Sequence, residues 1–392
     1  MILENMVDSM FAKRNLLWLE SVKIKTVSYR MSASTGSSLF TTCFALFLLD
    51  LFKVTDNFNS EERFYWISYI KQFQDKERGY FEPSVYYLAD RDRSRYQLTC
   101  FALSAMKILG CEPDYPLSFI DQWRTPEDIY KYLMENGCHL GKSGSGNKAM
   151  FLAIFLTWLY ERTRREDLKD MLDAWFDFHN RYQNCKGFWG RSLSNHSYHG
   201  FQNGVHQMLV YFYWNRPVPR LESIVDIVLS LQDYKGFFAP TPGGRGCWDY
   251  DAVHILANAL RYTSYKKNAI LNSLLRTEKA IFSEQNKDGG FCESKETSCH
   301  LSAFLKSFPF FFQGTFYPCF YRIMQYLIVV IKQKKENNTG WVERGIPWSE
   351  SDIWSTWLRC LTLAEIEVSR DAAKLSKYNF HKTIGIGNFH NG

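Results

Sequence analysis

A short motif occurs four times along the 392-residue chain, and each copy combines a glutamine, a glycine and one or two aromatic residues. The copies occupy residues 74–81, 183–189, 232–238 and 285–291. Glycine permits the left-handed backbone that ends many helices, and the aromatic residue beyond it can pack back onto the last helical turn. The glutamine side chain can tie such a turn to a neighbouring repeat. Copies spaced about fifty to a hundred residues apart predict a fold built from repeated units of one or two helix pairs.

Two kinds of helical segment alternate between these turns. Amphipathic segments predict helices with one solvent-exposed face, over residues 60–74, 126–136, 167–182, 221–232, 267–284 and 316–332. Apolar segments predict helices that are buried all round, over residues 41–52, 96–109, 147–160, 204–214, 249–262, 298–308 and 352–367. The first kind belongs to an outer ring and the second to an inner ring. The sequence therefore predicts an all-α fold, an α/α toroid (barrel) of six or seven helix pairs.

The toroid is expected to form a single domain over residues 1–392, in which residues 1–35 form an N-terminal helical extension and residues 371–392 a C-terminal tail. Ten cysteines occur without a CxxC pair, and several lie within apolar helical patterns, which favours free thiols in a reducing compartment. The first 23 residues carry charges every few positions and lack the hydrophobic region of a signal peptide. A cytoplasmic protein is expected.

The net charge of +6 is spread along the chain, and its nearest approach to a basic run, residues 332–335, is too short to indicate nucleic acid as a partner. Residues 39–52 are apolar but too short to span a bilayer. Residues 307–331 are longer and strongly aromatic, but prolines, a glycine and Arg322 interrupt them. They are interpreted as part of a buried helix pair, with a peripheral patch resting on a membrane surface as the alternative. No spanning segment is predicted, and the sequence leaves the oligomeric state open.

Residues 237–254 form the most unusual segment, in which a loop rich in proline and glycine leads into an apolar helix. The loop delivers Asp249 and Asp251 to the first turn of that helix, where both can face a central cavity beside Trp248 and Tyr250. Asp249 is a plausible N-cap, because the helix dipole stabilises an anion at this end. Capping requires neither Asp251 nor Trp248, which favours a functional site.

Two further polar clusters open apolar helices, one at residues 194–207 and the other at residues 350–357. Histidines and amides at a helix mouth can bind a diphosphate or move protons, although His196 is equally consistent with a solvated loop. Asp352 is interpreted mainly as an N-cap. In a toroid all three clusters converge on one mouth of the cavity. The predicted substrate-binding residues are Trp248, Tyr250, His199, Asn203, His206, His254, Asp352 and Trp354.

The repeated turns resemble the QW-type repeats of squalene–hopene cyclases and the equivalent turns of protein prenyltransferase β-subunits, over roughly residues 40 to 370. In class II terpene cyclases an Asp-x-Asp-Asp motif occupies a comparable position, and its middle acid protonates an alkene. Asp249-Tyr250-Asp251-Ala252 resembles that motif without its last acid. By this match Asp251 is the proton donor and Asp249 its partner. Those cyclases commonly pair two helical domains, whereas this chain offers one.

Protein prenyltransferases hold zinc through an Asp-x-Cys pair and a distant histidine. This chain has Cys247-Trp248-Asp249, the reverse order, with His254, His206 or His300 as candidate third ligands. Zinc accepts such ligands, but the spacing is generic. The Asp-Asp-x-x-Asp ionisation motif of class I cyclases is absent from the sequence. No cofactor is therefore predicted, with Mg²⁺ or Zn²⁺ retained as alternatives.

The leading hypothesis is an enzyme that acts on an apolar, isoprenoid-like small molecule by acid-initiated cyclisation or prenyl transfer. The first alternative is an α/α-barrel carbohydrate-active enzyme, a hydrolase or lyase, with Asp249 or Asp251 as general acid. The second is a non-catalytic toroid that binds a lipid or protein partner. A deep aromatic pocket would favour the enzyme that acts on an isoprenoid, and an open polar groove would favour the carbohydrate-active enzyme. A filled centre would favour the non-catalytic binding protein. The chain's 17% aromatic content agrees with an aromatic pocket, because aromatic faces can stabilise cations.

Overall fold

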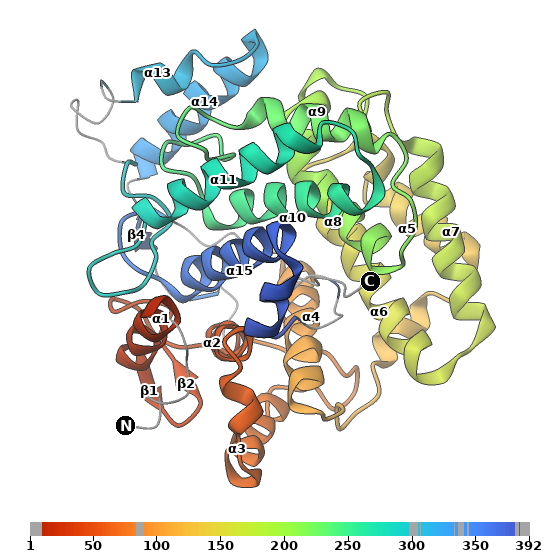
Figure 1. The fold of residues 1–392 in the computed structure, drawn as a ribbon. Coiled ribbons are helices and arrows are strands. Elements are labelled where there is room, and N and C mark those ends of the chain that lie inside the picture. Colours follow the sequence, from red (N-terminus) through yellow and green to blue (C-terminus); the bar gives the residue numbers. More distant parts are fainter. Residues whose placement is uncertain are drawn as a thin grey trace.

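Six helices with largely buried surfaces form a closed inner ring in the described part of the chain (Figure 1). They are α2 (Leu39–Leu51), α4 (Arg91–Leu109), α6 (Ser145–Thr163), α8 (Tyr198–Tyr213), α10 (Gly246–Tyr262) and α15 (Ile353–Arg370). Each helix packs against the next, and α15 packs against both α10 and α2, which closes the ring. The structure, a computed structural model, describes residues 10–83, 90–297, 305, 307–332, 334–335, 341–342, 345–380 and 384.

An outer helix precedes each inner helix along the chain. The outer helices are α1 (Met10–Ser21), α3 (Ser60–Lys71), α5 (Pro126–Glu135), α7 (Glu166–Tyr182), α9 (Leu221–Leu231) and α11 (Lys267–Ser283). The predicted α/α toroid is therefore confirmed. Of the two predicted numbers of helix pairs, six and seven, the described residues form six. Residues 1–35, expected as an extension, thus include the outer helix of the first pair, because α1 packs against α2.

Strands contribute little to the described structure. β1 (Lys23–Lys25) pairs with β2 (Ser28–Tyr29), and β3 (Lys334–Lys335) pairs with β4 (Ile346–Pro347), both antiparallel. The all-α class predicted from the sequence is therefore confirmed. No helix in the described residues has the length and apolar character needed to cross a membrane.

Helices α13 (Phe308–Phe311) and α14 (Phe316–Lys332) lie at the periphery, between α11 and α15 in the chain (Figure 1). Because α10 packs directly against α15, neither helix belongs to the inner ring. The predicted helix at residues 316–332 exists, but its assignment to an outer–inner pair is wrong. The predicted inner helix at residues 298–308 lies mostly outside the described residues. An apolar pattern identifies a helix without telling which of its faces the fold covers.

The repeated turns have one geometry. Their glycines all adopt positive φ angles, between 80° and 113°, at Gly79, Gly187, Gly236 and Gly289. A Cβ on Gly289 would lie 2.6 Å from the carbonyl oxygen of Arg14 in α1. In the same way, a Cβ on Gly236 would lie 2.6 Å from the carbonyl oxygen of Arg276 in α11. The turn after one outer helix therefore packs on the next outer helix, and the last turn returns to the first helix.

The predicted role of the glutamines is confirmed for three of the four copies. Gln74 Nε2 donates to the carbonyl oxygen of Gly79 in its own turn at 3.2 Å and to that of Tyr115 at 2.8 Å. Gln183 donates to Pro219 and Gln232 to Ser273 in the corresponding way, at 2.7 and 2.9 Å. Each of these side chains thus ties its turn to the following outer helix or the segment that leads into it. Gln285 bonds to the carbonyl oxygen of Gly289 in its own turn at 3.0 Å.

Several inner helices begin earlier than their apolar patterns predicted. Helix α4 begins at Arg91 instead of residue 96, α8 at Tyr198 instead of residue 204, and α10 at Gly246 instead of residue 249. The first turns of these helices carry polar and small residues, which interrupt the apolar pattern. Some residues of these first turns, Arg93 of α4 and Cys247 of α10 among them, line a cavity inside the ring.

Candidate active site

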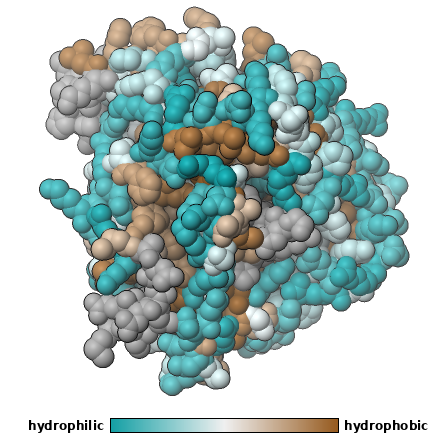
Figure 2. All heavy atoms as spheres, viewed as in Figure 1, coloured by the Kyte–Doolittle hydropathy of each residue, from teal (hydrophilic) through white to brown (hydrophobic). Residues whose placement is uncertain are grey.

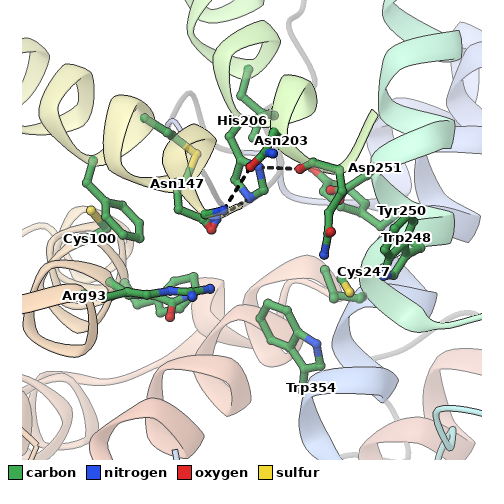
Figure 3. Close-up of a pocket in the computed structure, with 18 of the residues that line it drawn as sticks. Arg93, Cys100, Asn147, Asn203, His206, Cys247, Trp248, Tyr250, Asp251 and Trp354 are labelled. Atoms are coloured by element: carbon green, nitrogen blue, oxygen red, sulfur yellow. Dashed lines mark hydrogen bonds between the residues drawn. The ribbon is translucent and has the colours of Figure 1, made fainter. Parts of the chain in front are cut away.

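A cavity of about 250 Å³ lies inside the ring, and five of the six inner helices in the described chain line it: α4, α6, α8, α10 and α15 (Figure 3). Much of its wall is aromatic, formed by Phe101, Phe151, Trp248, Tyr250, Trp341, Trp354 and Trp357. Its polar lining comes largely from the first three turns of α4, α6 and α8, where Arg93, Gln97, Asn147, Gln202, Asn203 and His206 lie. The centre of the ring is therefore a pocket with an aromatic wall and a polar end.

The structure brings six of the ten predicted site residues to this cavity. Those that line it are Asn203, His206, Trp248, Tyr250, Asp251 and Trp354. The other four, His199, Asp249, His254 and Asp352, lie behind the wall and bond to other protein groups. The predicted convergence of three polar clusters on one cavity is thus observed, while the fine placement differs for these four residues.

Asp251 lies in the second turn of α10 and lines the cavity. Among the described residues, no group forms a hydrogen bond or ion pair with its carboxyl. Burial raises the pKa of Asp251 well above its usual range, and the nearby charges of Asp249 and Glu365 raise it further. An environment of this kind favours the protonated form of the carboxyl group, which is the form that a general acid uses.

Asp249 has a different environment and is fully buried. Its two carboxylate oxygens accept hydrogen bonds from the backbone N–H of Phe238 at 2.8 Å and of Arg245 at 2.9 Å. Arg359 Nη1 lies 3.6 Å from Oδ2. Burial raises the pKa of Asp249 to about 7, although Arg359 and the two N–H donors oppose this. Asp249 therefore holds the entry loop against α10.

The interpretation of Asp249 as an N-cap is wrong. Helix α10 begins at Gly246, and its N-cap is Arg245. Asp249 is the fourth residue of the helix, and its side chain accepts the N–H of the N-cap residue instead of occupying that position itself. The apolar pattern placed the helix start too late because Gly246 and Cys247 resemble the preceding loop in sequence.

Tyr250 lines the cavity and has two buried polar side chains, His254 and Glu365, behind it. Its hydroxyl lies 3.4 Å from His254 Nδ1, which lies 2.9 Å from Oε1 of Glu365 on α15. All three side chains are buried, and Oε2 of Glu365 has no hydrogen-bond partner among the described residues. His254 thus belongs to a buried polar group behind the aromatic wall. Sequence reasoning missed Glu365, although an acid that directly follows an apolar helical stretch was a signal for it.

His206 and Asn147 face the cavity from α8 and α6. His206 Nδ1 lies 2.9 Å from the carbonyl oxygen of Gln202, and Nε2 lies 2.8 Å from the side-chain nitrogen of Asn147. Burial lowers the pKa of His206 to about 4, so the imidazole is neutral at pH 7. Since the carbonyl only accepts, Nδ1 carries the proton and Nε2 accepts from Asn147.

His199 and Asn203 hold the loop before α6. His199 Nε2 lies 2.9 Å from the carbonyl oxygen of Gly141, and Asn203 Oδ1 accepts the N–H of Gly144 at 3.1 Å. Asn203 also lines the cavity, whereas His199 does not. The prediction of a substrate contact therefore fits the position of Asn203, and His199 positions the loop.

Asp352 caps α15, as its main interpretation predicted, and it lies outside the cavity. Its carboxylate accepts the N–H of Ser355 at 2.8 Å. The hydroxyl of Ser355 lies 2.7 Å from Oδ2 of Asp352 and 2.8 Å from Oε2 of Glu293. Glu293 lines the cavity and pairs with Arg245 at 3.1 Å. The cap thus supports an ion pair at the cavity edge that sequence reasoning missed.

Arg93 is another cavity residue that sequence reasoning missed, because it lies before the predicted start of its helix. Arg93, Gln97 and Phe101 are spaced four residues apart on α4, so one face of the helix carries all three into the cavity. Arg93 Nε is buried and has no hydrogen-bond partner among the described residues. Burial lowers the pKa of Arg93.

The zinc hypothesis required Cys247 and Asp249 to act together. Cys247 lines the cavity, whereas the Asp249 carboxylate accepts backbone N–H groups behind it. Within the described residues, no cluster of three histidine, cysteine or acidic side chains has the arrangement of a metal site. None of the nine described cysteines forms a disulfide bond.

The prenyltransferase alpha-alpha toroid domain model matches residues 11–202 and 164–308. The fold is also similar to two variant structures of the type II terpene cyclase MstE from Scytonema, each in complex with geranylgeranyl dihydroxybenzoate. One is 12% identical with a TM-score of 0.49, covering 93% of this chain and 97% of that chain. The other is also 12% identical, with a TM-score of 0.44 and coverage of 72% and 80%. No curated protein matches the chain. Because the two family matches together extend from α1 past α11, the chain belongs to the prenyltransferase α-α toroid domain family.

Proposed function

We propose that the chain cyclises a polyisoprenoid substrate by protonating one of its alkenes, with Asp251 as the proton donor. The observation that carries this proposal is a carboxyl group that lines an aromatic cavity with no hydrogen-bond partner among the described residues. Burial and the charges of Asp249 and Glu365 raise the pKa of this carboxyl group and so favour its protonated form. A group of this kind can give its proton to a weak base such as an alkene only when no better acceptor competes for it.

In the first step the Asp251 O–H bond breaks and a C–H bond forms at one alkene carbon, leaving a tertiary carbocation. Further alkenes then attack this cation in turn, and each attack forms a C–C bond. Loss of a proton from the last cation ends the sequence, so the product is an isomer of the substrate. Water returns a proton to Asp251.

The aromatic wall supports the cationic stages. Trp248, Tyr250, Trp354 and Trp357 line the cavity with Asp251. A cation over an aromatic face is stabilised by about 0.5–2 kcal/mol, and by more where water is excluded. Asp249 acts from behind the wall as the partner carboxylate that raises the pKa of Asp251.

The carbohydrate alternative fits these observations less well. Acid-catalysed glycoside hydrolysis places two carboxyl groups on either side of the scissile bond, so both must face the substrate. Asp249 is bonded to backbone N–H groups outside the cavity. Glu293 lines the cavity with Asp251, but its carboxylate is paired with Arg245 and accepts the hydroxyl of Ser355. A purely structural toroid would fill its centre, whereas this ring encloses a cavity.

The test compares wild type with Asp251→Asn on squalene, geranylgeranyl diphosphate and oligosaccharides, with products identified by mass spectrometry. We expect a cyclic isomer of an isoprenoid, and a loss of rate of roughly a hundredfold or more in the variant. Asp50→Asn is the matched control, because Asp50 is a buried acid of α2 that bonds Thr55 at 2.6 Å and does not line the cavity. Full cyclase activity in Asp251→Asn, or sugar products from wild type, would contradict the proposal.

A further inference from the structure

Helix α14 has two apolar faces, and the fold covers only one of them. Its inward face contains Pro318, Arg322, Tyr326 and Val329, all buried and spaced three or four residues apart. Its outward face carries exposed apolar side chains at Phe316, Phe320, Ile323, Met324, Leu327, Ile328 and Ile331. Phe308 and Phe312, at and just beyond α13, are also exposed. These nine residues form what we call the apolar face, and Figure 2 shows hydrophobic residues over this region at the upper left.

Arg322 anchors the helix so that the apolar face stays outward. Its guanidinium is fully buried and donates to the hydroxyl of Tyr198 at 2.8 Å. It also donates to the carbonyl oxygens of Leu231 at 3.1 Å and Gln313 at 2.6 Å. These bonds join α14 to α8 and to the end of α9. A helix held in this way does not expose seven large apolar side chains through loose packing, so their exposure requires another explanation.

The apolar face lies close to the cavity. Tyr321 of α14 stacks on Tyr198 with ring centroids 5.3 Å apart. Tyr198 in turn contacts Trp248 edge-on, with centroids 5.9 Å apart, and Trp248 lines the cavity. Two ring contacts thus connect the helix that bears the apolar face with the wall of the pocket.

The charges in this segment of the sequence are mostly positive. Residues 307–331 contain no aspartate or glutamate, and their single charged residue is the buried Arg322. Lys332, Lys334 and Lys335 follow directly in the sequence. Within residues 307–340 a second copy of the chain would offer one carboxylate, Glu336, to pair with these three lysines. Anionic lipid head groups would offer phosphates and carboxylates beside an apolar layer.

We infer that the apolar face of α13 and α14 docks on the surface of an anionic lipid bilayer. The large side chains enter the boundary between head groups and acyl chains, and the positive charge of the lysine-rich sequence at residues 332–335 favours anionic head groups. This is contact with one leaflet, because no described helix can cross a membrane. The inference rests on surface residues and holds whatever reaction the cavity performs.

The test measures sedimentation of the full chain with vesicles of phosphatidylcholine containing phosphatidylserine. We expect wild type to bind, and the combined variant Phe320→Gln, Leu327→Gln, Ile331→Gln to lose roughly tenfold or more in affinity. The matched control combines Phe64→Gln, Leu140→Gln and Leu193→Gln, which are exposed apolar residues elsewhere, at 64%, 47% and 76% exposure. The control should bind like wild type. Circular dichroism melting establishes that the variants remain folded.

A second variant tests the charges without altering the apolar face. This variant combines Lys332→Gln, Lys334→Gln and Lys335→Gln. It should bind the mixed vesicles roughly tenfold or more weakly than wild type at low salt, and added salt should also weaken the binding of wild type. Binding that is unaffected by both combined variants overturns the inference. The inference is also overturned if light scattering shows that wild type is a dimer, that the apolar-face variant is a monomer, and that neither protein binds vesicles.

Discussion

Asp249 and Asp251 lie two residues apart on α10, yet only the carboxyl of Asp251 lines the cavity. Asp249 accepts two backbone N–H groups and lies 3.6 Å from Arg359, whereas Asp251 lacks a hydrogen-bond partner in the described chain. Adjacent positions on a helix point in different directions, so one short motif can supply a bonded carboxylate and an unbonded acid. The two residues should therefore respond in opposite ways to the same substitution.

Asp251→Asn should stabilise the protein at neutral pH. Because the fold raises the pKa of this acid above 3.8, the native state binds the proton more tightly than the unfolded state does. That stabilisation is complete at acid pH and is lost as the pH rises towards the folded-state pKa. The asparagine does not titrate, so its Tm should exceed that of wild type by about 2 °C or more at pH 7, and the gain should vanish near pH 3. Calorimetry across this range checks the prediction, and a gain that grows on acidification would falsify it.

Asp249→Asn should destabilise the protein instead. The amide nitrogen would replace an oxygen that accepts the N–H of Phe238 or Arg245, and two donors would then face each other. The expected cost is about 1–3 kcal/mol in the free energy of unfolding, measured with urea. Wild-type stability in this variant would mean that the loop at residues 238–245 is not held by the carboxylate.

Arg359→Met should cost about 3–5 kcal/mol, because it leaves the buried Asp249 without its cation. The guanidinium is fully buried and also donates to the carbonyl oxygens of Cys292 at 3.1 Å and Glu293 at 2.7 Å. Arg370→Met is the control, since Arg370 forms an exposed pair with Glu278 whose loss should cost less than about 1 kcal/mol. Equal losses for the two variants in denaturant titrations would argue against a special role for Arg359.

Trp357→Leu should slow cyclisation more than Trp357→Phe does. Trp357 lines the cavity and stacks against Phe44 with centroids 5.7 Å apart. Leucine fills much of the space without an aromatic face, and the loss of one cation–π contact corresponds to roughly three- to thirtyfold in rate. Steady-state rates and product profiles of the two variants distinguish the aromatic contribution from simple packing. Identical profiles for leucine and phenylalanine would exclude a cation-stabilising role for this side chain.

Gly289→Ala should destabilise the fold more than Gly110→Ala. Both glycines have positive φ, at 101° and 70°, so each substitution incurs backbone strain of about 1–2 kcal/mol. A Cβ on Gly289 would also lie 2.6 Å from the carbonyl oxygen of Arg14, whereas nothing lies within 4 Å of a Cβ on Gly110. The difference in unfolding free energy between the two variants measures the closure of the outer ring. If both lose the same amount, the contact with α1 contributes nothing.

The sequence was most informative where one pattern repeated. The four turns and the alternating helices predicted the ring, because glycine conformation and burial are local properties that residue types reveal. The pattern failed for α14, whose outward face is as apolar as a buried one. Periodicity records that a face is apolar, while only the packing shows whether the fold covers it.

The sequence predicted the position of the candidate site more reliably than it predicted which residues form the site. Asp251, Trp248 and His206 line the cavity as predicted, while Arg93 was missed because the polar first turn of α4 was taken for a loop. Arg359 and Glu365 were missed for another reason. Both stand within an apolar helix, and their partners come from segments that only the closed ring brings near.

The contact between the last repeated turn and α1 joins two segments that are synthesised at very different times. Arg14 of α1 approaches the carbonyl oxygen of Asn286, 272 residues later in the chain. The first helix therefore leaves the ribosome long before the surface that covers it exists. The contacts of α1 with α2 can form early, whereas those of Arg14 and Trp18 with Gly289 and Gly290 must wait until most of the chain exists. Contacts between segments so far apart in sequence form slowly, and an unclosed ring exposes apolar surface through which chains can aggregate.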